Sequence, residues 1–367
     1  MANFSPLAVS RSETAAPIRV KMLFRAGHDR SAVESEMLRR FPGGVPEWGR
    51  CRFIFDPAAR EYDWLVVYDD LPPRAKERFS IRDELLACPR AHTLVITSEP
   101  STIKLYGTGY LRQFGRVLTS QEPCVIRHPG AIFSQPALVW FYGRGHEHGR
   151  YDRMVASPPE DKTALISTVC SSKRQTHTLH SRRYDFVQEL RELIPELEVF
   201  GHGVRPIADK AEALDRYRYH IAIENHVCQH HWTEKLSDPF LGLCLPFYHG
   251  CPNAADYFPE ESFIAIDIND SAGAARQIKE AIATDAYARR LPAIKEARRL
   301  VLERYGLFAT VSRIVTERHP APIAPAAELP EVIYSRRAYR RNPCNMVAFA
   351  WEKTWLGLSR RLGRAGR

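Results

Sequence analysis

The chain of 367 residues lacks long hydrophobic runs. A membrane-spanning helix needs about 18 or more consecutive apolar residues, and the longest apolar stretch, around residues 240–248, is interrupted by Pro246. The N-terminal segment also lacks the uninterrupted apolar stretch of a secretory signal. We therefore expect neither a transmembrane span nor a secretory signal.

Cysteine is scattered, and no C-x-x-C pair occurs among the eight cysteines, which are residues 51, 88, 124, 170, 228, 244, 251 and 344. Most of them have apolar neighbours, which favours reduced thiols over a disulfide framework. We expect a cytoplasmic protein, and peripheral association with the inner face of a membrane stays an open alternative.

Acidic residues are outnumbered by basic ones, with 43 against 52 and a formal net charge of +9. This balance indicates an acidic partner, which could be a nucleotide-sugar, an anionic membrane surface or nucleic acid. The 44% hydrophobic and 26% charged content is that of an ordinary soluble globular protein. The length suffices for two domains, each with its own core.

Short apolar runs alternate with helical repeats throughout, which predicts an α/β protein with doubly wound parallel sheets. In the first half we expect strands at 18–24, 51–55, 62–68, 93–97, 114–119 and 137–142, and helices at 31–41 and 80–88. In the second half we expect strands at 164–169, 197–200, 221–223, 245–248 and 262–268. The helices expected there are 182–193, 211–218, one from Thr233 to near Gly242, 272–284 and 287–317.

A charged, proline-containing segment at 143–162 is the best domain boundary. We divide the chain into a flexible leader (1–17), an N-terminal domain (18–157), a C-terminal domain (158–318), a proline-rich linker (319–335) and a basic amphipathic tail (336–367). His146 and His148 in the boundary segment either bind a metal or belong to a solvated linker.

The stretch 221–267 is central to the prediction. Its first strand stops at Glu224-Asn225, and ligands of open α/β sheets bind at the carboxyl ends of strands. Thr233 is a suitable N-cap for the next helix, whose first turn holds Glu234 and Lys235. A lysine beside the free N–H groups of a helix start is an anion site, and phosphate fits that geometry best.

Two further groups could face a phosphate. Ser171, Ser172 and Lys173 follow a predicted strand, although without the glycine spacing of a Rossmann or P-loop motif. Arg183 lies in the first turn of a helix, where a cation opposes the dipole unless an anion such as pyrophosphate compensates it. A surface salt bridge is the alternative for Arg183.

In the first half, Glu99 stands just past the end of an apolar strand, where partial desolvation raises the pKa of a carboxyl toward a useful range for a general base. A helix-capping or solvated glutamate is the alternative. Asp69-Asp70 at another strand end could catalyse or form a turn. The aromatic residues 140–142 could stack on a sugar or pack in the core.

Four potential metal ligands lie close together in the central loop: His226, Cys228, His230 and His231. Their spacing matches no common zinc pattern, so we predict no metal site. The role of the histidines stays open.

The tail carries nine lysines and arginines after Tyr334 against one acid, Glu352. Its apolar residues fall on one helical face: Val347, Trp351, Trp355, Leu358 and Leu362. This pattern is typical of an interfacial membrane anchor. A helix docked on its own protein and a disordered basic tail are the alternatives, and we do not expect nucleic acid as a partner.

Several blocks of the central stretch resemble a known family in order and spacing: Glu224-Asn225, seven intervening residues, Thr233-Glu234-Lys235, then 245–250 (LPFYHG), Phe258-Pro259 and 262–264 (SFI). Together they resemble the donor-binding signature of the α-1,3/1,4-fucosyltransferases, glycosyltransferase family 10. The resemblance implies a GT-B-like fold, with two Rossmann-like domains facing a cleft, of which domain 18–157 binds the acceptor and domain 158–318 binds the nucleotide-sugar. It also implies inverting transfer of fucose from GDP-fucose to a glycan.

The resemblance also implies roles for individual residues. It makes Glu99 the general base, Arg183 the diphosphate ligand, and Glu234 the ligand of the ribose hydroxyls. The other donor-binding residues it implies are Glu224, Asn225, His231, Thr233 and Lys235. His231 stands where the family often has a tyrosine, and Trp232 replaces a small aliphatic residue.

No cofactor is implied, and a divalent metal is expected to stimulate at most, because fixed cations stand where a D-x-D-bound ion otherwise would. Two other functions stay open, namely a GT-B transferase for a different nucleotide-sugar and a non-catalytic protein that binds glycans or membranes. The acceptor and the linkage, α-1,3 or α-1,4, are not determined by the sequence.

Overall fold

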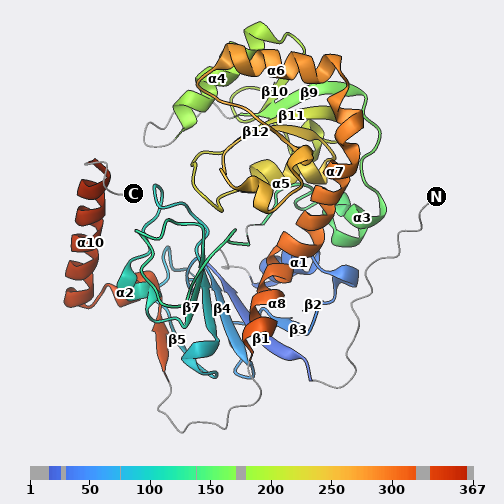
Figure 1. The fold of residues 1–367 in the computed structure, drawn as a ribbon. Coiled ribbons are helices and arrows are strands. Elements are labelled where there is room, and N and C mark those ends of the chain that lie inside the picture. The colour runs from blue at the N-terminus through green and yellow to red at the C-terminus, as the bar shows by residue number, and fades with distance from the viewer. Residues whose placement is uncertain are drawn as a thin grey trace.

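The computed structural model describes residues 16–25, 30–74, 76–137, 139–170, 179–319 and 331–361. Two α/β domains lie one above the other in Figure 1, the lower one blue to cyan and the upper one green to yellow, and the C-terminal part of the chain, in red, returns to the lower domain. No helix in these ranges combines the length and the apolar character that a membrane span requires. The predicted phosphate loop, Ser171 to Lys173, lies outside the described residues.

The first domain is built on a seven-stranded sheet in the order β2-β3-β1-β4-β6-β7-β8, parallel except for the β2–β3 pair. Its strands are β1 (Ile18–Phe24), β2 (Glu47–Trp48), β3 (Cys51–Ile54), β4 (Trp64–Tyr68), β6 (Thr93–Ile96), β7 (Arg116–Thr119) and β8 (Ala131–Phe133). Side chains of a strand alternate between the two faces, so Trp64 and Val66 enter one apolar cluster while Leu65 and Val67 enter another. Both faces of this sheet are therefore buried.

The second domain contains a five-stranded sheet, parallel throughout, in the order β10-β9-β11-β12-β13. Its strands are β9 (Ala164–Val169), β10 (Leu197–Phe200), β11 (Tyr217–Ile223), β12 (Leu245–His249) and β13 (Ile264–Ala265). The strand order changes direction between β9 and β11. Ligands bind at such switch points, outside the carboxyl ends of the strands.

The helices of both domains flank these sheets. They are α1 (Arg30–Leu38), α2 (Thr108–Leu111), α3 (Tyr151–Ala156), α4 (His180–Leu193), α5 (Glu234–Leu241), α6 (Ser271–Ala283) and α7 (Ala286–Leu300). Short 3-10 helices are η1 (Pro42–Gly44), η2 (Arg90–His92), η3 (Glu147–Gly149), η4 (Lys210–Ala213), η5 (Ala254–Asp256) and η6 (Glu260–Ser262). The predicted α/β fold with parallel sheets is thus confirmed.

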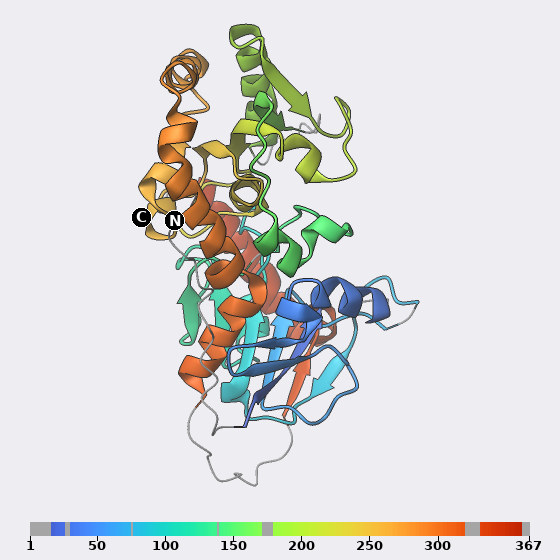
Figure 2. The same cartoon turned by 90° about the vertical axis from the view of Figure 1, so that its right-hand side faces the viewer.

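A long helical column joins the two domains (Figure 2). It consists of α7, the π-helical turn η7 (Val301–Tyr305) and α8 (Leu307–Arg318). α7 packs in the second domain, whereas Phe308 of α8 stacks on Phe41 of the first domain with ring centroids 4.0 Å apart. The helix predicted at 287–317 therefore corresponds to α7, η7 and α8.

The C-terminal segment returns to the first domain. β14 (Val332–Tyr334), inside the range predicted as a linker, pairs antiparallel with β5 (Asp83–Leu85). α9 (Arg336–Tyr339) and α10 (Pro343–Arg361) follow, and α10 stands beside α2 in Figure 1. Glu352 of α10 accepts hydrogen bonds from the backbone N–H and the hydroxyl of Thr108, so this helix docks on its own protein.

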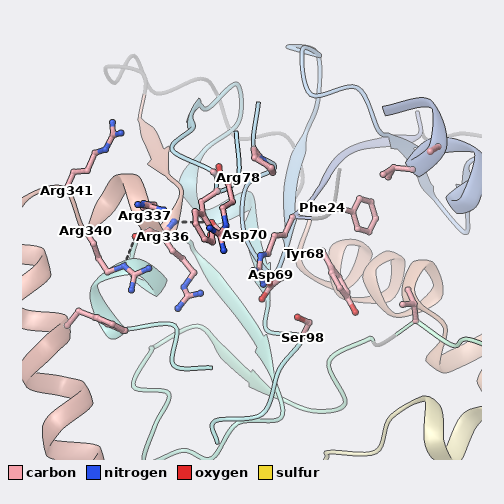
Figure 3. A pocket seen from close by; sticks show the side chains of 18 of the residues that line it. Phe24, Tyr68, Asp69, Asp70, Arg78, Ser98, Arg336, Arg337, Arg340 and Arg341 are labelled. Atoms are coloured by element: carbon pink, nitrogen blue, oxygen red, sulfur yellow. Dashed lines mark hydrogen bonds and ion pairs between the residues drawn. The ribbon is translucent and has the colours of Figure 1, made fainter. Parts of the chain in front are cut away.

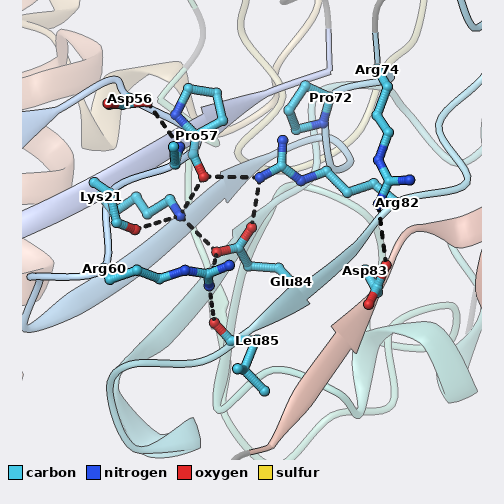
Figure 4. Close-up of polar contacts among 12 residues, drawn as sticks. Lys21, Asp56, Pro57, Arg60, Pro72, Arg74, Arg82, Asp83, Glu84 and Leu85 are labelled. Carbon is cyan, nitrogen blue, oxygen red and sulfur yellow. Dashed lines mark hydrogen bonds and ion pairs between the residues drawn. The ribbon is translucent and has the colours of Figure 1, made fainter.

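A buried ion pair anchors β5 to the main sheet (Figure 4). The Lys21 ammonium lies 2.6 Å from the Glu84 carboxylate, and both side chains are almost fully buried. Lys21 also donates to the carbonyl oxygens of Pro57 and Ala59. Burial lowers the pKa of Lys21 more than Glu84 raises it. This pair fixes the strand on which β14 and the C-terminal segment assemble.

Three predicted elements are wrong. Residues 80–88 are not a helix but contain β5, because Glu84 forms an ion pair with the buried Lys21. The Ser80 hydroxyl donates to the Pro72 carbonyl oxygen. In 137–142, Phe141 donates its N–H to Asp238 of the other domain rather than to a sheet. Residues 211–218 are split between η4 and the start of β11, and β8 was not predicted.

Candidate donor-binding and catalytic site

Glu224 follows the last residue of β11 and is completely buried. Its carboxylate accepts hydrogen bonds from the Thr233 N–H at 2.8 Å and from the Thr233 hydroxyl at 2.7 Å. A Cβ atom on Gly250 would lie 2.4 Å from Cγ of Glu224, so this packing requires glycine there. Glu224 thus ties the start of α5 to β11. The hydrogen bonds of the Glu224 carboxylate to Thr233 are thus structural, and its predicted donor contact stays a prediction.

The start of α5 has the predicted cap, because the Thr233 hydroxyl accepts from the Lys235 N–H at 3.3 Å. The Lys235 ammonium lies 2.9 Å from Glu234 and 3.8 Å from Glu224. Burial alone would lower the pKa of Lys235, but the charges of Glu234 and Glu224 outweigh it and the pKa is raised. Lys235 therefore stays cationic at the helix start.

A second cation at this helix start was missed by the sequence analysis. The Lys210 ammonium lies 2.8 Å from Asp238 and 3.6 Å from Glu234. Burial would raise the pKa of Glu234, yet the charges of Lys235 and Lys210 hold it well below its usual range. Lys210 is the first residue of η4, directly after Asp209, which forms a capping box with Glu212. The capping box can be recognised in the sequence and predicts a helical turn. It does not predict that Lys210 contacts α5.

Arg183 of α4 lies at the same end of the sheet. Its Nη1 donates to the Asn225 side-chain oxygen at 2.9 Å, and the Asn225 carbonyl accepts from the Leu179 N–H at 3.3 Å. The Arg183 Nε is buried and has no hydrogen-bond partner among the described residues. The charge of Arg183 acts on Lys235, where it lowers the pKa. The structure thus brings Arg183, Asn225 and Lys235 together at the β9–β11 switch point.

Glu99 lies in the loop after β6 of the first domain. Its backbone carbonyl accepts a hydrogen bond of 2.7 Å from Gln121, whereas its carboxylate has no hydrogen-bond or ion-pair partner in the described part of the chain. Burial, and then the charge of Asp69, raise the pKa of Glu99, while Lys235 of the other domain lowers it. Glu99 and Lys235 are therefore within electrostatic reach of each other, although 135 intervening residues separate them in sequence.

The loop 226–232 contacts the first domain. The His231 Nδ1 lies 2.9 Å from the Ser120 hydroxyl, and the His226 Nδ1 lies 3.3 Å from the Thr102 hydroxyl. Burial lowers the pKa of His231 to about 3, so its ring is neutral at neutral pH. The geometry makes His231, predicted as a donor ligand, an interdomain contact.

The loop also provides two members of a group with metal-ligand chemistry. Glu122 of the first domain, His226 and Cys228 have ligand atoms within 4.8 Å of one another. The His226 Nε2 lies 3.5 Å from the Glu122 carboxylate, and His226 helps to lower the pKa of that carboxyl to about 2 against the effect of burial. Glu122 comes from another domain, so no sequence spacing could include it, and the absence of a metal stays a prediction.

Two other predicted groups have packing roles. Trp140 and Tyr142 are buried, as the core-packing alternative expects. His148 Nε2 lies 3.0 Å from the Asp209 carboxylate, and His146 stacks on His148. These histidines lie at the domain boundary and hold a helix cap in place.

Asp69, the first residue of the acidic pair, lies in a turn after β4. It adopts a positive φ of 74°, typical of a tight turn, and pairs with Arg25 at 3.1 Å and with Lys104. Burial would raise the pKa of Asp69, but Lys104 and its other partners lower it, so it remains an anion. Asp69 thus acts on the site through its charge on Glu99.

Two domains with parallel sheets face each other, with a cationic helix start at the switch point of one and a desolvated carboxylate from the other. This is a GT-B-like fold. Residues 159–288 match the family model described as glycosyltransferase family 10 (fucosyltransferase) C-term. The matched range extends from just before β9 into α7, so the similarity to this family lies in the second domain. The match supports an enzyme of the fucosyltransferase type.

Solved structures with a similar arrangement include an α1,3-fucosyltransferase with GDP-fucose, at 14% identity over 82% of this chain and 94% of that chain, with a TM-score of 0.44. The α1,3-fucosyltransferase with GDP shares 15% identity over 83% of this chain and 96% of that chain, with a TM-score of 0.47. An α-glucosyltransferase in complex with UDP and a 13-mer DNA shares 10% identity over 82% of this chain and 100% of that chain, with a TM-score of 0.47.

Proposed function

We propose that the protein transfers fucose from GDP-fucose to a hydroxyl group of a glycan acceptor, with inversion at the anomeric carbon and an α-1,3 or α-1,4 linkage. The observation that carries the proposal is the mutual placement of Glu99 and Lys235. A carboxylate with a raised pKa in one domain lies within electrostatic reach of the cationic helix start of the other. The family match of the second domain supports the donor.

The donor diphosphate binds at the β9–β11 switch point. Arg183 offers its unpartnered Nε, Lys235 offers an ammonium group that stays charged, and the start of α5 offers free N–H groups and its positive dipole end. Glu234 accepts from the ribose hydroxyls in this proposal, while Asn225 orients Arg183. Ser171, Ser172 and Lys173 follow β9 in the chain and remain candidates for phosphate contacts.

Three residues support the donor site without contacting the donor in this proposal, namely Glu224, Thr233 and His231. Glu224 holds Thr233, and Thr233 caps the helix that presents Lys235. His231 holds the loop against Ser120 of the first domain. These residues set the geometry of the cations and do not touch the reacting atoms.

In the reaction, Glu99 removes the proton of the acceptor hydroxyl, and the oxygen attacks the anomeric carbon of fucose. The bond between that carbon and the diphosphate oxygen breaks, and its electron pair leaves with GDP. Attack from the face opposite GDP inverts the configuration. Arg183 and Lys235 stabilise the charge that develops on the leaving diphosphate, so these fixed cations provide what a divalent ion provides elsewhere.

The test is a titration of the protein with GDP-fucose, followed by incubation with a panel of glycans and analysis of products by mass. We expect binding of GDP-fucose and GDP, much weaker binding of UDP-sugars, and a product that is heavier by one fucose residue. Tighter binding of another nucleotide-sugar would assign a different donor. Glycan binding without turnover or donor binding would indicate a non-catalytic protein.

The C-terminal helix supports a second, peripheral partner. Val347, Trp351 and Leu358 of α10 are 64%, 72% and 54% exposed, an apolar face on a strongly basic segment. This face is available to an anionic membrane surface while the opposite side of α10 docks on α2. Sedimentation with anionic but not with neutral vesicles, lost on replacement of Trp351 by Ser, is the expected result. Sedimentation that is the same with both vesicle types would contradict it.

A further inference from the structure

A cavity of about 1430 Å³ lies in the first domain. Its wall includes Phe24, Tyr68 and Ser98, which stand at or just beyond the carboxyl ends of β1, β4 and β6. In this sheet the strand order changes direction at β1, between β3 on one side and β4 on the other. The cavity therefore occupies the switch point of the first sheet, the place where an open α/β sheet binds a ligand.

The wall of the cavity is strongly cationic. Eight arginine and lysine side chains line it, against three carboxylates. Each carboxylate is already used by the protein: Glu36 pairs with Arg40, Asp69 pairs with Lys104, and Asp70 accepts from the N–H of Arg336. Asp69 also pairs with Arg25 of the wall at 3.1 Å, and the three carboxylates leave a net excess of positive charge in the wall.

Most of this charge comes from the C-terminal segment, as Figure 3 shows. Arg336, Arg337, Arg340 and Arg341 line the cavity, together with Lys353 of α10. None of these five has an ion-pair partner among the residues that the structure describes. The Arg336 Nε is buried and lacks a hydrogen-bond partner within the same residues.

The arginines are nevertheless held in place. Arg337 lies 4.7 Å from the ring centroid of Phe79, and Arg340 lies 4.7 Å from that of Phe349. A guanidinium stacked on a ring can still donate from its N–H edge. In Arg340 the Nε donates to the Arg336 carbonyl oxygen at 2.9 Å, and its two terminal nitrogens face the cavity as candidate donors to an oxyanion. Burial, and then the charge of Arg336, lower the pKa of Arg340, while the charge of Asp70 raises it less.

We propose that this cavity binds a phosphate group carried by the acceptor, so that the acceptor is an anionic, phosphorylated saccharide. Several forked arginines around one space match phosphate or diphosphate oxygens in geometry and charge. The inference rests on the proposed function, because it assigns the cavity to the acceptor rather than to the donor.

The position of the cavity relates the phosphate to the reaction. Ser98 lines the cavity and directly precedes Glu99. Arg25 and Asp69, also in the wall, act on the pKa of Glu99 through their charges. A saccharide whose phosphate is held by the arginines extends from there toward the base. The C-terminal segment then completes the acceptor site.

Apolar side chains share the wall with the arginines, among them Val33, Met37, Phe79 and Phe349. A phosphate could therefore arrive on a lipid-linked sugar or on a soluble sugar phosphate. The shared chemistry is the phosphate monoester or diester oxygen, and the experiment separates the two sources.

The experiment is a calorimetric titration of the whole protein, with saturating GDP to fill the donor site. The probes are glucose 1-phosphate, decyl phosphate, inorganic pyrophosphate and neutral methyl glucoside. We expect the three anionic probes to bind and methyl glucoside not to bind. The stronger of glucose 1-phosphate and decyl phosphate identifies the source. Equal binding of neutral and anionic probes, or no binding of any probe, overturns the proposal.

The matched variants are Arg337→Gln/Arg341→Gln in the cavity and Arg205→Gln/Arg313→Gln on exposed surfaces elsewhere. Both remove two positive charges. Loss of a charged donor to a phosphate costs about 10–100-fold in affinity, so we expect the cavity variant to weaken anionic probes by at least tenfold and the surface variant to leave them unchanged. Equal weakening by both overturns the cavity assignment.

Two readouts keep this inference separate from the proposed function. GDP affinity, measured in the same titrations, is expected to be unchanged in both variants. If GDP does not bind at all, the proposed function fails, whereas binding of the phosphate probes still reports on the cavity. If GDP binds and the probes do not, only the acceptor inference fails.

Discussion

Glu99→Gln tests the base assignment with little structural disturbance. The substitution keeps size and shape but removes the ability to accept a proton, and the Glu99 carboxylate has no hydrogen-bond or ion-pair partner in the described part of the chain to lose. A positioned general base contributes about 10²–10⁴-fold to the rate, which corresponds to about 3–5 kcal/mol in the activation free energy. We expect kcat to fall by that factor, with the affinity for GDP-fucose unchanged.

The stability of the variant has an expected sign. Burial and Asp69 raise the pKa of Glu99 in the folded protein, so the fold favours the neutral carboxyl and its ionised form at neutral pH costs folding free energy. Glutamine removes that cost. The melting temperature of Glu99→Gln at pH 7 is therefore expected to equal or exceed that of the parent.

The assay measures GDP release with saturating acceptor, alongside a calorimetric titration with GDP-fucose. Glu61→Gln is the control, because Glu61 lies in the same domain with a side chain that is 91% exposed. In the parent, kcat/KM should fall as pH decreases through the raised pKa of Glu99, above its usual value of 4.5, and this limb should disappear in Glu99→Gln. A variant within threefold of the parent, or one that retains the acid limb, would refute the assignment.

Other perturbations follow from the donor site and from the core. Arg183→Lys removes the forked guanidinium and should weaken GDP binding by about 10–100-fold in calorimetry. Glu84→Gln leaves the Lys21 ammonium buried without a counterion and should lower the free energy of unfolding by about 3–5 kcal/mol in urea denaturation. Dialysis against EDTA should leave the transfer rate unchanged, because Arg183 and Lys235 stabilise the leaving group.

Each of these has a control and a contrary outcome. Arg182→Lys changes the neighbouring arginine, which pairs with Glu189 on the surface, and should not affect GDP. Equal effects of the two changes would show that Arg183 has no special role. Glu61→Gln should alter the unfolding free energy by less than about 0.5 kcal/mol, and a similar small effect of Glu84→Gln would contradict the buried pair. Activity lost with EDTA and restored by zinc would assign a metal to the Glu122 group.

The sequence determined most of the second domain. Apolar runs ending in polar residues located β9, β10, β11 and β12, and the Thr233 cap followed by Lys235 located the start of α5. These signals are local, since a buried parallel strand is a continuous apolar run and a helix cap depends on adjacent residues. The same locality placed Glu99 beyond a strand end, where its pKa is indeed raised.

Only the tertiary structure decided what those residues face. Residues 83–85 form a strand in which Glu84 is the counterion of the buried Lys21, a residue distant in sequence. Sheet order and domain docking place Lys210 at the start of α5, Glu122 beside His226 and Cys228, and the arginines of α9 in the wall of the cavity. The spacing of these residues along the chain does not predict those positions. Burial and the charge of distant neighbours then set which carboxylates are held inert, as in Glu224, and which are left reactive, as in Glu99.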